Sequence, residues 1–339
     1  MIRLQQQPQK SFIVEIISTT TFEIDNSIHF VNCRKLFSKQ YRMDFVKDLL
    51  LGGTSGVIAK TICAPLERVK IVIQTQSANA QLAGSSQQYS GIVNSFKRIA
   101  MDQGVLSFWR GNVANCLRYF PTQAMNFAFK EKYQAIFVRP REEVGFAVFF
   151  MGYLASGAAA GATSLTVAYP LEFTYTRMAA DVGKDGKKMY SGLVDCIKQT
   201  VQSDGIKGLY RGYGPSVAGI VVYRAGYFGL YDYSKTLSSL NLHDRGFKTI
   251  MTKFSIALSI DIFSAMLAYP LDTIRRSLMM QSGRKDVQFT NVIGCFKHIV
   301  SKDGLSGLYK GAMMNNIRAI GSALVLVIYD ELKGAASKH

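Results

Sequence analysis

Single basic residues inside apolar stretches are the first candidates for chemistry in this sequence. Lys60, Arg118 and Arg318 each lie in a segment that is otherwise rich in aliphatic and aromatic residues, and Arg275 and Arg276 end another such segment. A cation in a membrane-like setting is costly and usually marks the path of a solute. Cations that converge from different segments would attract and bind an anion. The alternative is that each arginine only pairs with a neighbouring carboxylate.

Carboxylates follow a fixed proline pattern near these cations. The pattern reads "PLERVK" from Pro65, "PLEFTYTR" from Pro170 and "PLDTIR" from Pro270. Lys60 precedes Glu67 by seven residues, about two helical turns, so both side chains would face the interior of the same bundle.

A second motif keeps the same register. It reads "QGVLSFWRG", "DGIKGLYRG" and "DGLSGLYKG", and it ends at Gly111, Gly212 and Gly311. Both motifs recur about every hundred residues, and two linked motifs in register three times indicate a threefold internal repeat.

The composition favours a membrane bundle with a polar interior. The 339 residues are 48% hydrophobic and 19% charged, and the net charge of +17 suits anionic partners. Nucleic acid is disfavoured as a partner because the arginines are single and embedded in apolar segments. The five scattered cysteines argue against a disulfide-stapled secreted module. A secretory signal is not expected, since no short basic region is followed by an apolar core, and the acidic residues Glu15, Glu23 and Asp25 argue against a cleaved presequence.

Each repeat contains two apolar segments long enough to cross a bilayer. The first segments span roughly 44–79, 147–181 and 247–281, and the second span roughly 112–137, 213–237 and 312–333. We therefore predict an all-α membrane protein of six helices in three hairpins, with repeats at 43–141, 142–245 and 246–339. A soluble helical solenoid is the alternative, but its repeats would be shorter. Residues 1–42 form an N-terminal extension that is β-branched and aromatic, unlike a disordered tail.

The threefold pattern resembles the mitochondrial carrier family. Within it, "FWRGNVANCLRYFPTQAMNFAFKEKY", "YRAGYFGLYD", "LVLVIYDELK" and "RRSLMMQSGRK" resemble the ADP/ATP carriers, and the last keeps four residues of that subfamily's Arg-Arg-Arg-Met-Met-Met. The resemblance implies a pseudo-threefold bundle around a central cavity, with a short amphipathic helix on the matrix side of each repeat. It also implies a multi-pass protein of the mitochondrial inner membrane that is a transporter and not an enzyme. Cardiolipin is expected as a bound lipid, and no cofactor is expected.

The resemblance also implies roles for particular residues. The nucleotide would bind to the basic residues of the cavity and to a slot for the adenine ring: Lys60, Arg118, Gly219, Ile220, Tyr223, Arg275, Arg276 and Arg318. A matrix gate would consist of Glu67, Lys70, Glu172, Tyr175, Arg177, Asp272 and Arg275. A cytoplasmic gate would consist of Glu131, Gln134, Tyr231, Asp232, Lys235, Tyr329, Asp330 and Lys333. Alternation between the two gates would drive exchange.

Several positions depart from the family pattern. Tyr175 and Gln134 stand where each gate expects a cation, so Glu67 would need a hydrogen bond from Tyr175 or a contact from Arg177. Ser277 and Leu278 replace an arginine and a methionine, and Ala268 replaces a serine expected beside the nucleotide.

Asp261 is an added carboxylate in an apolar stretch. Its eleven-residue separation from Asp272 predicts that it faces the cavity, where it would either oppose anion entry or pair with Arg275, Arg276 or another cation of the cavity.

Two functions stay open on these observations. One is a divergent ADP/ATP exchanger of the inner membrane. The other is a degenerate carrier-fold subunit, with weak or no transport, that docks on a respiratory complex through residues 1–42.

Overall fold

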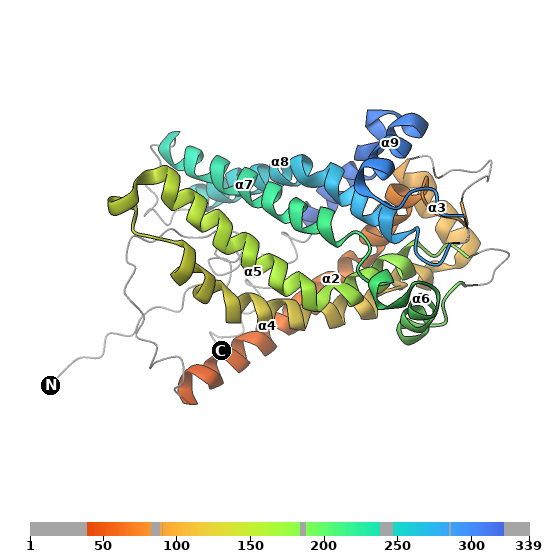
Figure 1. Cartoon of the computed structure of the whole chain (residues 1–339), viewed down its shortest axis with the longest axis horizontal. Coiled ribbons are helices and arrows are strands. Elements are labelled where there is room, and N and C mark those ends of the chain that lie inside the picture. The colour runs from red at the N-terminus through yellow and green to blue at the C-terminus, as the bar shows by residue number, and fades with distance from the viewer. Residues whose placement is uncertain are drawn as a thin grey trace.

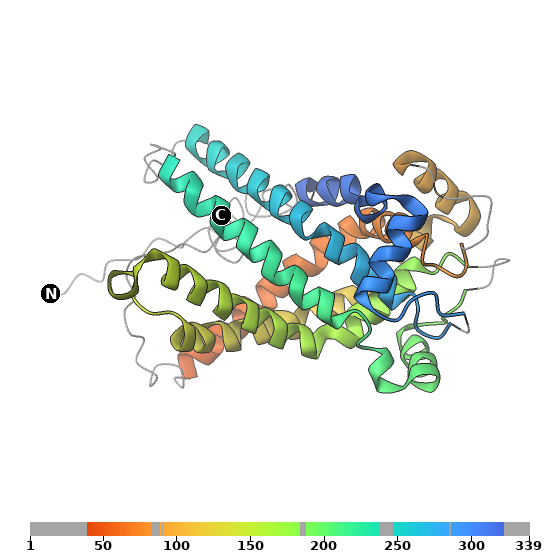
Figure 2. The ribbon, with the colours of Figure 1, turned by 45° about the horizontal axis from the view of Figure 1, so that its top comes forward.

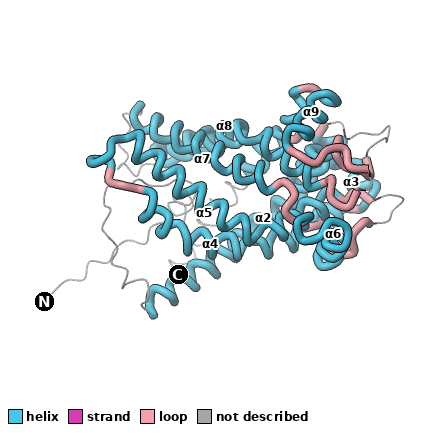
Figure 3. Tube along the Cα trace, in the orientation of Figure 1, coloured by secondary structure: helices cyan, strands magenta, loops and turns pink. Residues whose placement is uncertain are grey.

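The structure, a computed structural model, describes residues 39–82, 89, 91–183, 188–237, 247–284 and 286–321. Every regular element in these ranges is a helix, as the sequence predicts (Figure 3). The elements are α2 (Lys39–Thr75), α3 (Ile92–Gln103), η2 (Val105–Trp109), α4 (Asn112–Phe137), α5 (Arg141–Ala180), α6 (Leu193–Gly208), α7 (Tyr213–Leu237), α8 (Phe247–Met279), α9 (Val292–Asp303) and η3 (Leu305–Tyr309). A further helical stretch begins at residue 312 and is described to residue 321. Residues 1–38 of the predicted extension lie outside the described ranges, and residues 39–42 belong to α2.

Long and short helices occupy different parts of the bundle. Helices α2, α4, α5, α7 and α8 run along its length, whereas α3, α6 and α9 lie together near one end (Figure 1). Helix α4 packs beside α5 and α7 beside α8, and the turned view shows the two pairs diverging away from the short helices (Figure 2). We call the end that carries α3, α6 and α9 the closed end of the bundle.

Apolar length alone does not account for all the long helices. Residues 143–180, within α5, and 254–279, within α8, are long and apolar enough to cross a membrane by length and composition. The other long helices carry more charge, and part of it faces the interior, as with Lys60 on α2 and Arg118 on α4. Large apolar side chains are exposed instead on the outer surface, including Ile62, Val167 and Leu267, as expected where lipid replaces water.

The three motif glycines occupy backbone positions at the closed end that other residues would not fit. Gly111, Gly212 and Gly311 have φ of +86°, +84° and +83°, a backbone region that favours glycine. Each also touches the backbone of another repeat. A Cβ on Gly212 would lie 2.6 Å from the Arg275 carbonyl oxygen, and one on Gly311 would lie 3.2 Å from that of Lys70. Glycine at these positions therefore lets the repeats approach closely.

The charged residues of the same motif close each short helix onto the loop that follows it. Asp204 pairs with Arg211 at 3.1 Å, and Asp303 pairs with Lys310 at 2.7 Å. The first repeat has Gln103 in place of the acid, and its side-chain oxygen accepts a hydrogen bond from the buried Arg68 at 2.6 Å. The main apolar core includes Leu209 and Leu308 of these loops, so buried side chains hold the short helices against the bundle.

Candidate functional site: a basic cavity closed by an inter-repeat ring

A cavity of about 640 Å³ lies between the long helices. All eight residues predicted to bind the nucleotide line this cavity: Lys60, Arg118, Gly219, Ile220, Tyr223, Arg275, Arg276 and Arg318. They come from α2, α4, α7, α8 and the helical stretch that begins at residue 312. The structure thus brings together residues that lie up to 258 positions apart in the sequence.

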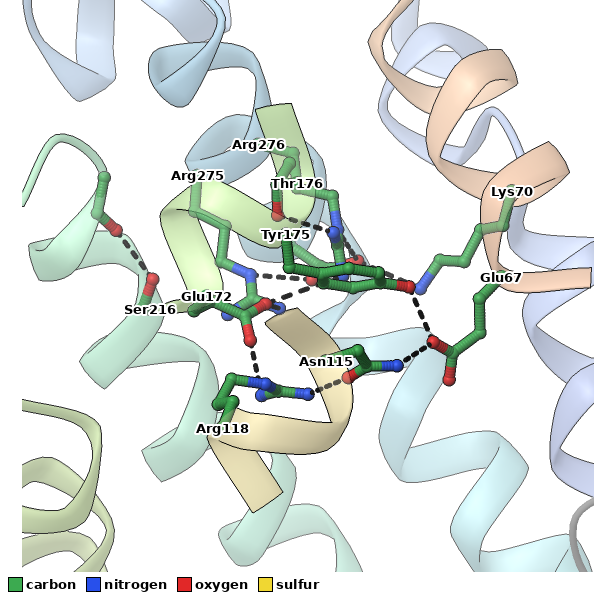
Figure 4. A network of polar contacts seen from close by, with 12 residues as sticks. Glu67, Lys70, Asn115, Arg118, Glu172, Tyr175, Thr176, Ser216, Arg275 and Arg276 are labelled. Atoms are coloured by element: carbon green, nitrogen blue, oxygen red, sulfur yellow. Dashed lines mark hydrogen bonds and ion pairs between the residues drawn. The ribbon is translucent and has the colours of Figure 1, made fainter. Parts of the chain in front are cut away.

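Three contacts between repeats form the floor of the cavity (Figure 4). Lys70 Nζ lies 3.1 Å from an Asp272 oxygen, and Arg275 Nη2 lies 3.4 Å from a Glu172 oxygen.

The third contact joins Tyr175 to Glu67, whose oxygen accepts a hydrogen bond from the phenol at 2.6 Å. The contacts link the third repeat to the first, the second to the third, and the first to the second. We call them the floor ring.

The floor ring decides between the two expectations for Glu67. Tyr175 is the partner, and it replaces an ion pair by a hydrogen bond to a carboxylate. Arg177 donates instead to the Met280 carbonyl oxygen at 3.2 Å and to the Tyr190 hydroxyl, and it does not line the cavity. Because the ring lies beside the closed end, the cavity opens toward the other end.

Polar residues reinforce the floor ring from two sides. Asn115 donates to Glu67 at 2.8 Å and accepts from Arg118 at 2.9 Å. Arg118 also forms an ion pair with Glu172. On the other side of the ring, Lys70 donates a hydrogen bond to Asn315 of the third repeat at 2.8 Å.

Sequence reasoning missed these asparagines, although a signal existed. Asn115, Ser216 and Asn315 each lie four residues after a motif glycine, so aligning the repeats would have singled them out.

Arg276, the second of the two adjacent arginines, has a different role from Arg275. Arg276 Nε lies 3.3 Å from an Asp272 oxygen, and its Nη1 donates to Thr176 at 3.1 Å, so it braces the ring between α8 and α5.

Ser277 and Leu278 turn away from the cavity and are buried, and Leu278 belongs to the main core. These two departures from the family pattern therefore leave the cavity wall unchanged.

The cavity keeps an excess of positive charge even though its arginines have partners. Among the described residues that line it, eight are basic and three are acidic: Lys60, Lys70, Arg118, Lys130, Arg224, Arg275, Arg276 and Arg318 against Glu67, Glu172 and Asp272. Pairing with carboxylates, the alternative for each arginine, accounts for part of this charge, since Arg318 also lies 3.9 Å from Glu67. The remaining cations favour an anionic ligand. Lys60 is the clearest example of a cation available to a ligand, because no described carboxylate lies within ion-pair distance of it. Its ammonium lies 5.6 Å from the centre of the Tyr119 ring.

The predicted adenine slot forms one wall. Gly219, Ile220 and Tyr223 share α7, and Gly161 on α5 leaves room for Ile220, because a Cβ there would lie 3.1 Å from the Ile220 side chain. The Tyr223 ring stacks on Tyr227 with centroids 6.0 Å apart.

The expectation for Asp261 needs correction. Its carboxylate accepts a hydrogen bond from the Tyr223 hydroxyl, and it is not among the residues that line the cavity. Arg275 and Arg276 pair with Glu172 and Asp272 instead, so Asp261 does not neutralise the floor. The helical period predicts the direction of the Asp261 side chain around the axis of α8 only coarsely, and its partner, Tyr223, comes from the neighbouring helix α7.

Most of the predicted cytoplasmic gate cannot be located. Gln134 lines the cavity and donates to the Tyr153 hydroxyl at 3.2 Å, and Glu131 is exposed. The side chains of the other predicted members lie outside the described residues: Tyr231, Asp232, Lys235, Tyr329, Asp330 and Lys333. The cytoplasmic gate stays a prediction. Ala268 lines the cavity, so its substitution for serine removes a hydroxyl from the wall.

A helical bundle of three repeats around a charged cavity defines a membrane carrier, and comparison with known proteins agrees. The mitochondrial carrier protein family matches residues 41–141, 147–241 and 247–339. The chain is 49% identical to human ADP/ATP translocase 3 over 295 residues, which cover 86% of this chain and 97% of that protein. It is also 49% identical to the mitochondrial substrate carrier family protein ancA of Dictyostelium discoideum, over 85% of this chain and 93% of that protein. An ADP,ATP carrier protein of Parachlorella kessleri is 47% identical, with 86% and 85% covered.

The chain therefore belongs to the mitochondrial carrier family. The prediction of three carrier repeats in an all-α fold is confirmed. Membership places the protein in the mitochondrial inner membrane and makes it a transporter, not an enzyme.

Proposed function

We propose that this protein exchanges ADP for ATP across the mitochondrial inner membrane by alternating access. The observation that carries the proposal is the surplus of basic over acidic side chains in one cavity, eight against three among the described residues. Such a cavity suits a ligand with several negative charges, and nucleotide di- and triphosphates are ligands of this kind. Relatives that match most of this chain are named as ADP/ATP translocases.

The floor ring supplies the mechanism. With Lys70–Asp272, Arg275–Glu172 and Tyr175–Glu67 in contact, the cavity is closed beside the short helices, which the carrier family places on the matrix side. Phosphates that bind Arg118 or Arg275 compete with Glu172 for the same cations. Binding would thus loosen the ring, and its free energy would be spent on opening the closed side. An empty cavity lacks this contribution, which couples import to export.

The alternative of a degenerate structural subunit gains no support from these relatives, which are named as carriers. That alternative explained the departures from the family pattern as losses. Tyr175 nevertheless completes the third contact of the ring, and Ser277 and Leu278 face the core. A bound cardiolipin, the multi-pass arrangement of six helices and docking of residues 1–42 on a respiratory complex stay predictions.

Exchange in liposomes tests the proposal. Purified protein reconstituted with internal ATP should take up labelled ADP, and uptake should stop when the internal nucleotide is omitted. Lys60→Gln should reduce uptake and the thermal stabilisation by ADP while costing the ligand-free protein less stability than the loss of a floor-ring contact, because no described carboxylate lies within ion-pair distance of Lys60 and Glu67 keeps Arg318 at 3.9 Å.

Two comparisons sharpen the test. Arg98→Gln, which removes a half-buried cation that pairs with Asp102 and lies over the Tyr89 ring outside the cavity, is the matched control and should change neither quantity. Absence of exchange by well-folded wild-type protein would refute the proposed function.

A further inference from the structure

The Asp261 carboxylate and the Tyr223 phenol form a hydrogen bond beside the cavity, and neither residue belongs to the floor ring. Asp261 lies on α8 in an otherwise apolar stretch, and its Oδ1 accepts the hydroxyl proton of Tyr223 on α7. None of the ion pairs among the described residues involves Asp261. Tyr223 lines the cavity, whereas Asp261 does not. Tyr223 therefore lies between the cavity and the carboxylate, and its hydroxyl is held by a group outside the cavity.

The direction of this hydrogen bond limits what the phenol can do. A phenol has one proton to donate, and an ionised carboxylate only accepts. While Tyr223 donates to Asp261, its oxygen has only acceptor capacity left for a ligand. Stacking on Tyr227 restrains the orientation of the ring as well. A ligand group that contacts this oxygen must then be a hydrogen-bond donor.

We propose that Asp261 is a positioning residue that makes Tyr223 an obligate hydrogen-bond acceptor, so that the cavity wall selects purine bases with an exocyclic amine over bases with a carbonyl at that place. The inference rests on the proposed nucleotide transport and adds a basis for choosing among nucleotides. Buried polar groups discriminate in this way because a mismatched partner leaves two acceptors facing each other. Without Asp261 the phenol proton is free to turn toward a carbonyl, and the preference disappears.

ADP and IDP are the probes that isolate this contact. They share ribose and phosphates, and their bases have the same shape, but adenine carries an amine where hypoxanthine carries a carbonyl, and hypoxanthine has a proton on the neighbouring N1. Loss of the Asp261 charge raises the positive potential for both ligands equally. The ratio of their dissociation constants therefore reports on the base and not on the phosphates.

The experiment measures ADP and IDP binding to the full chain in detergent, to three test variants and to one control variant. The wild type should prefer ADP by about threefold to tenfold, the range of one neutral hydrogen bond. Asp261→Asn should lower the ratio toward one, because the asparagine amide donates as well as accepts and so no longer fixes the phenol as an acceptor. Tyr223→Phe, which keeps the stacked ring, should do the same, and the double variant should lower the ratio no further. Asp286→Asn, at an exposed position outside the cavity, is the matched control and should leave the ratio unchanged.

Two results would overturn the inference while leaving the transport proposal intact. One is an ADP to IDP ratio that stays at the wild-type value in both Asp261→Asn and Tyr223→Phe. The other is an equal tightening of both ligands in Asp261→Asn, which would show that Asp261 acts through its charge alone. Failure of wild-type protein to bind ADP at all would instead overturn the proposed function, and this inference with it.

Discussion

Removing one hydroxyl from the floor ring, by Tyr175→Phe, should destabilise the ligand-free protein. The phenol donates to a Glu67 oxygen at 2.6 Å, and Tyr175 is only 5% exposed. A hydrogen bond to a charged group is worth about 1.5–3 kcal/mol. Glu67 keeps Asn115 at 2.8 Å and Arg318 at 3.9 Å, so we expect a loss near the lower end, about 1.5 kcal/mol.

The assay is thermal unfolding in detergent, with a matched substitution elsewhere in the core. At about 2–4 °C per kcal/mol, Tyr175→Phe should lower the melting temperature by about 3–6 °C. Tyr269→Phe is the control, because Tyr269 is also buried but donates to a neutral acceptor, the Lys310 carbonyl oxygen at 2.9 Å. It should cost less, about 0.5–1.5 kcal/mol.

A double-mutant cycle with Glu67→Gln separates the contact from the packing of the ring. In the Glu67→Gln background the phenol meets a neutral amide, so the additional loss from Tyr175→Phe should shrink to that of Tyr269→Phe. Because phenylalanine keeps the packing of the ring in the main core, an equal loss in both backgrounds would mean that the hydroxyl stabilises the protein independently of the Glu67 carboxylate. The view of Tyr175 as the third member of the floor ring would then be wrong.

The remaining predictions concern the closed end and the buried thiols. Gly212→Ala should lower the melting temperature strongly, because it places a residue at φ of +84° and a methyl group 2.6 Å from the Arg275 carbonyl oxygen; Gly214→Ala, where the added methyl group meets open space, is the control and should change it little. Burial raises the pKa of the Cys196 and Cys295 thiols to about 12, so maleimide should label them in unfolded but hardly in folded protein at pH 8, as peptide mass spectrometry would show. Because the unfolded chain loses these thiol protons from about pH 8.5 and the folded chain keeps them to about pH 12, their linkage should lower stability as pH rises through that interval, and Cys196→Ser with Cys295→Ser should flatten the fall. Ready labelling in the folded state would contradict the burial of the two thiols.

The sequence alone determined the elements and their repetition, because the signals for these are local. Apolar length, prolines and glycines placed the first helices at 44–79, 147–181 and 247–281, and the structure has them at Lys39–Thr75, Arg141–Ala180 and Phe247–Met279. The helical period also placed Lys60 and Glu67 on one face, and both line the cavity.

Tertiary structure decided which side chains meet. Glu67 and Tyr175 are 108 residues apart, and nothing along the chain distinguishes Tyr175 from Arg177 as the partner. The same holds for Asp261, whose position on α8 predicted an inward direction but not the phenol of Tyr223 on α7 that occupies it. Ser277 follows two arginines of the floor and yet faces the core, because consecutive residues on a helix point about 100° apart. A helix's sequence fixes the direction of each side chain around its own axis, whereas the partner in that direction depends on how the repeats pack against one another.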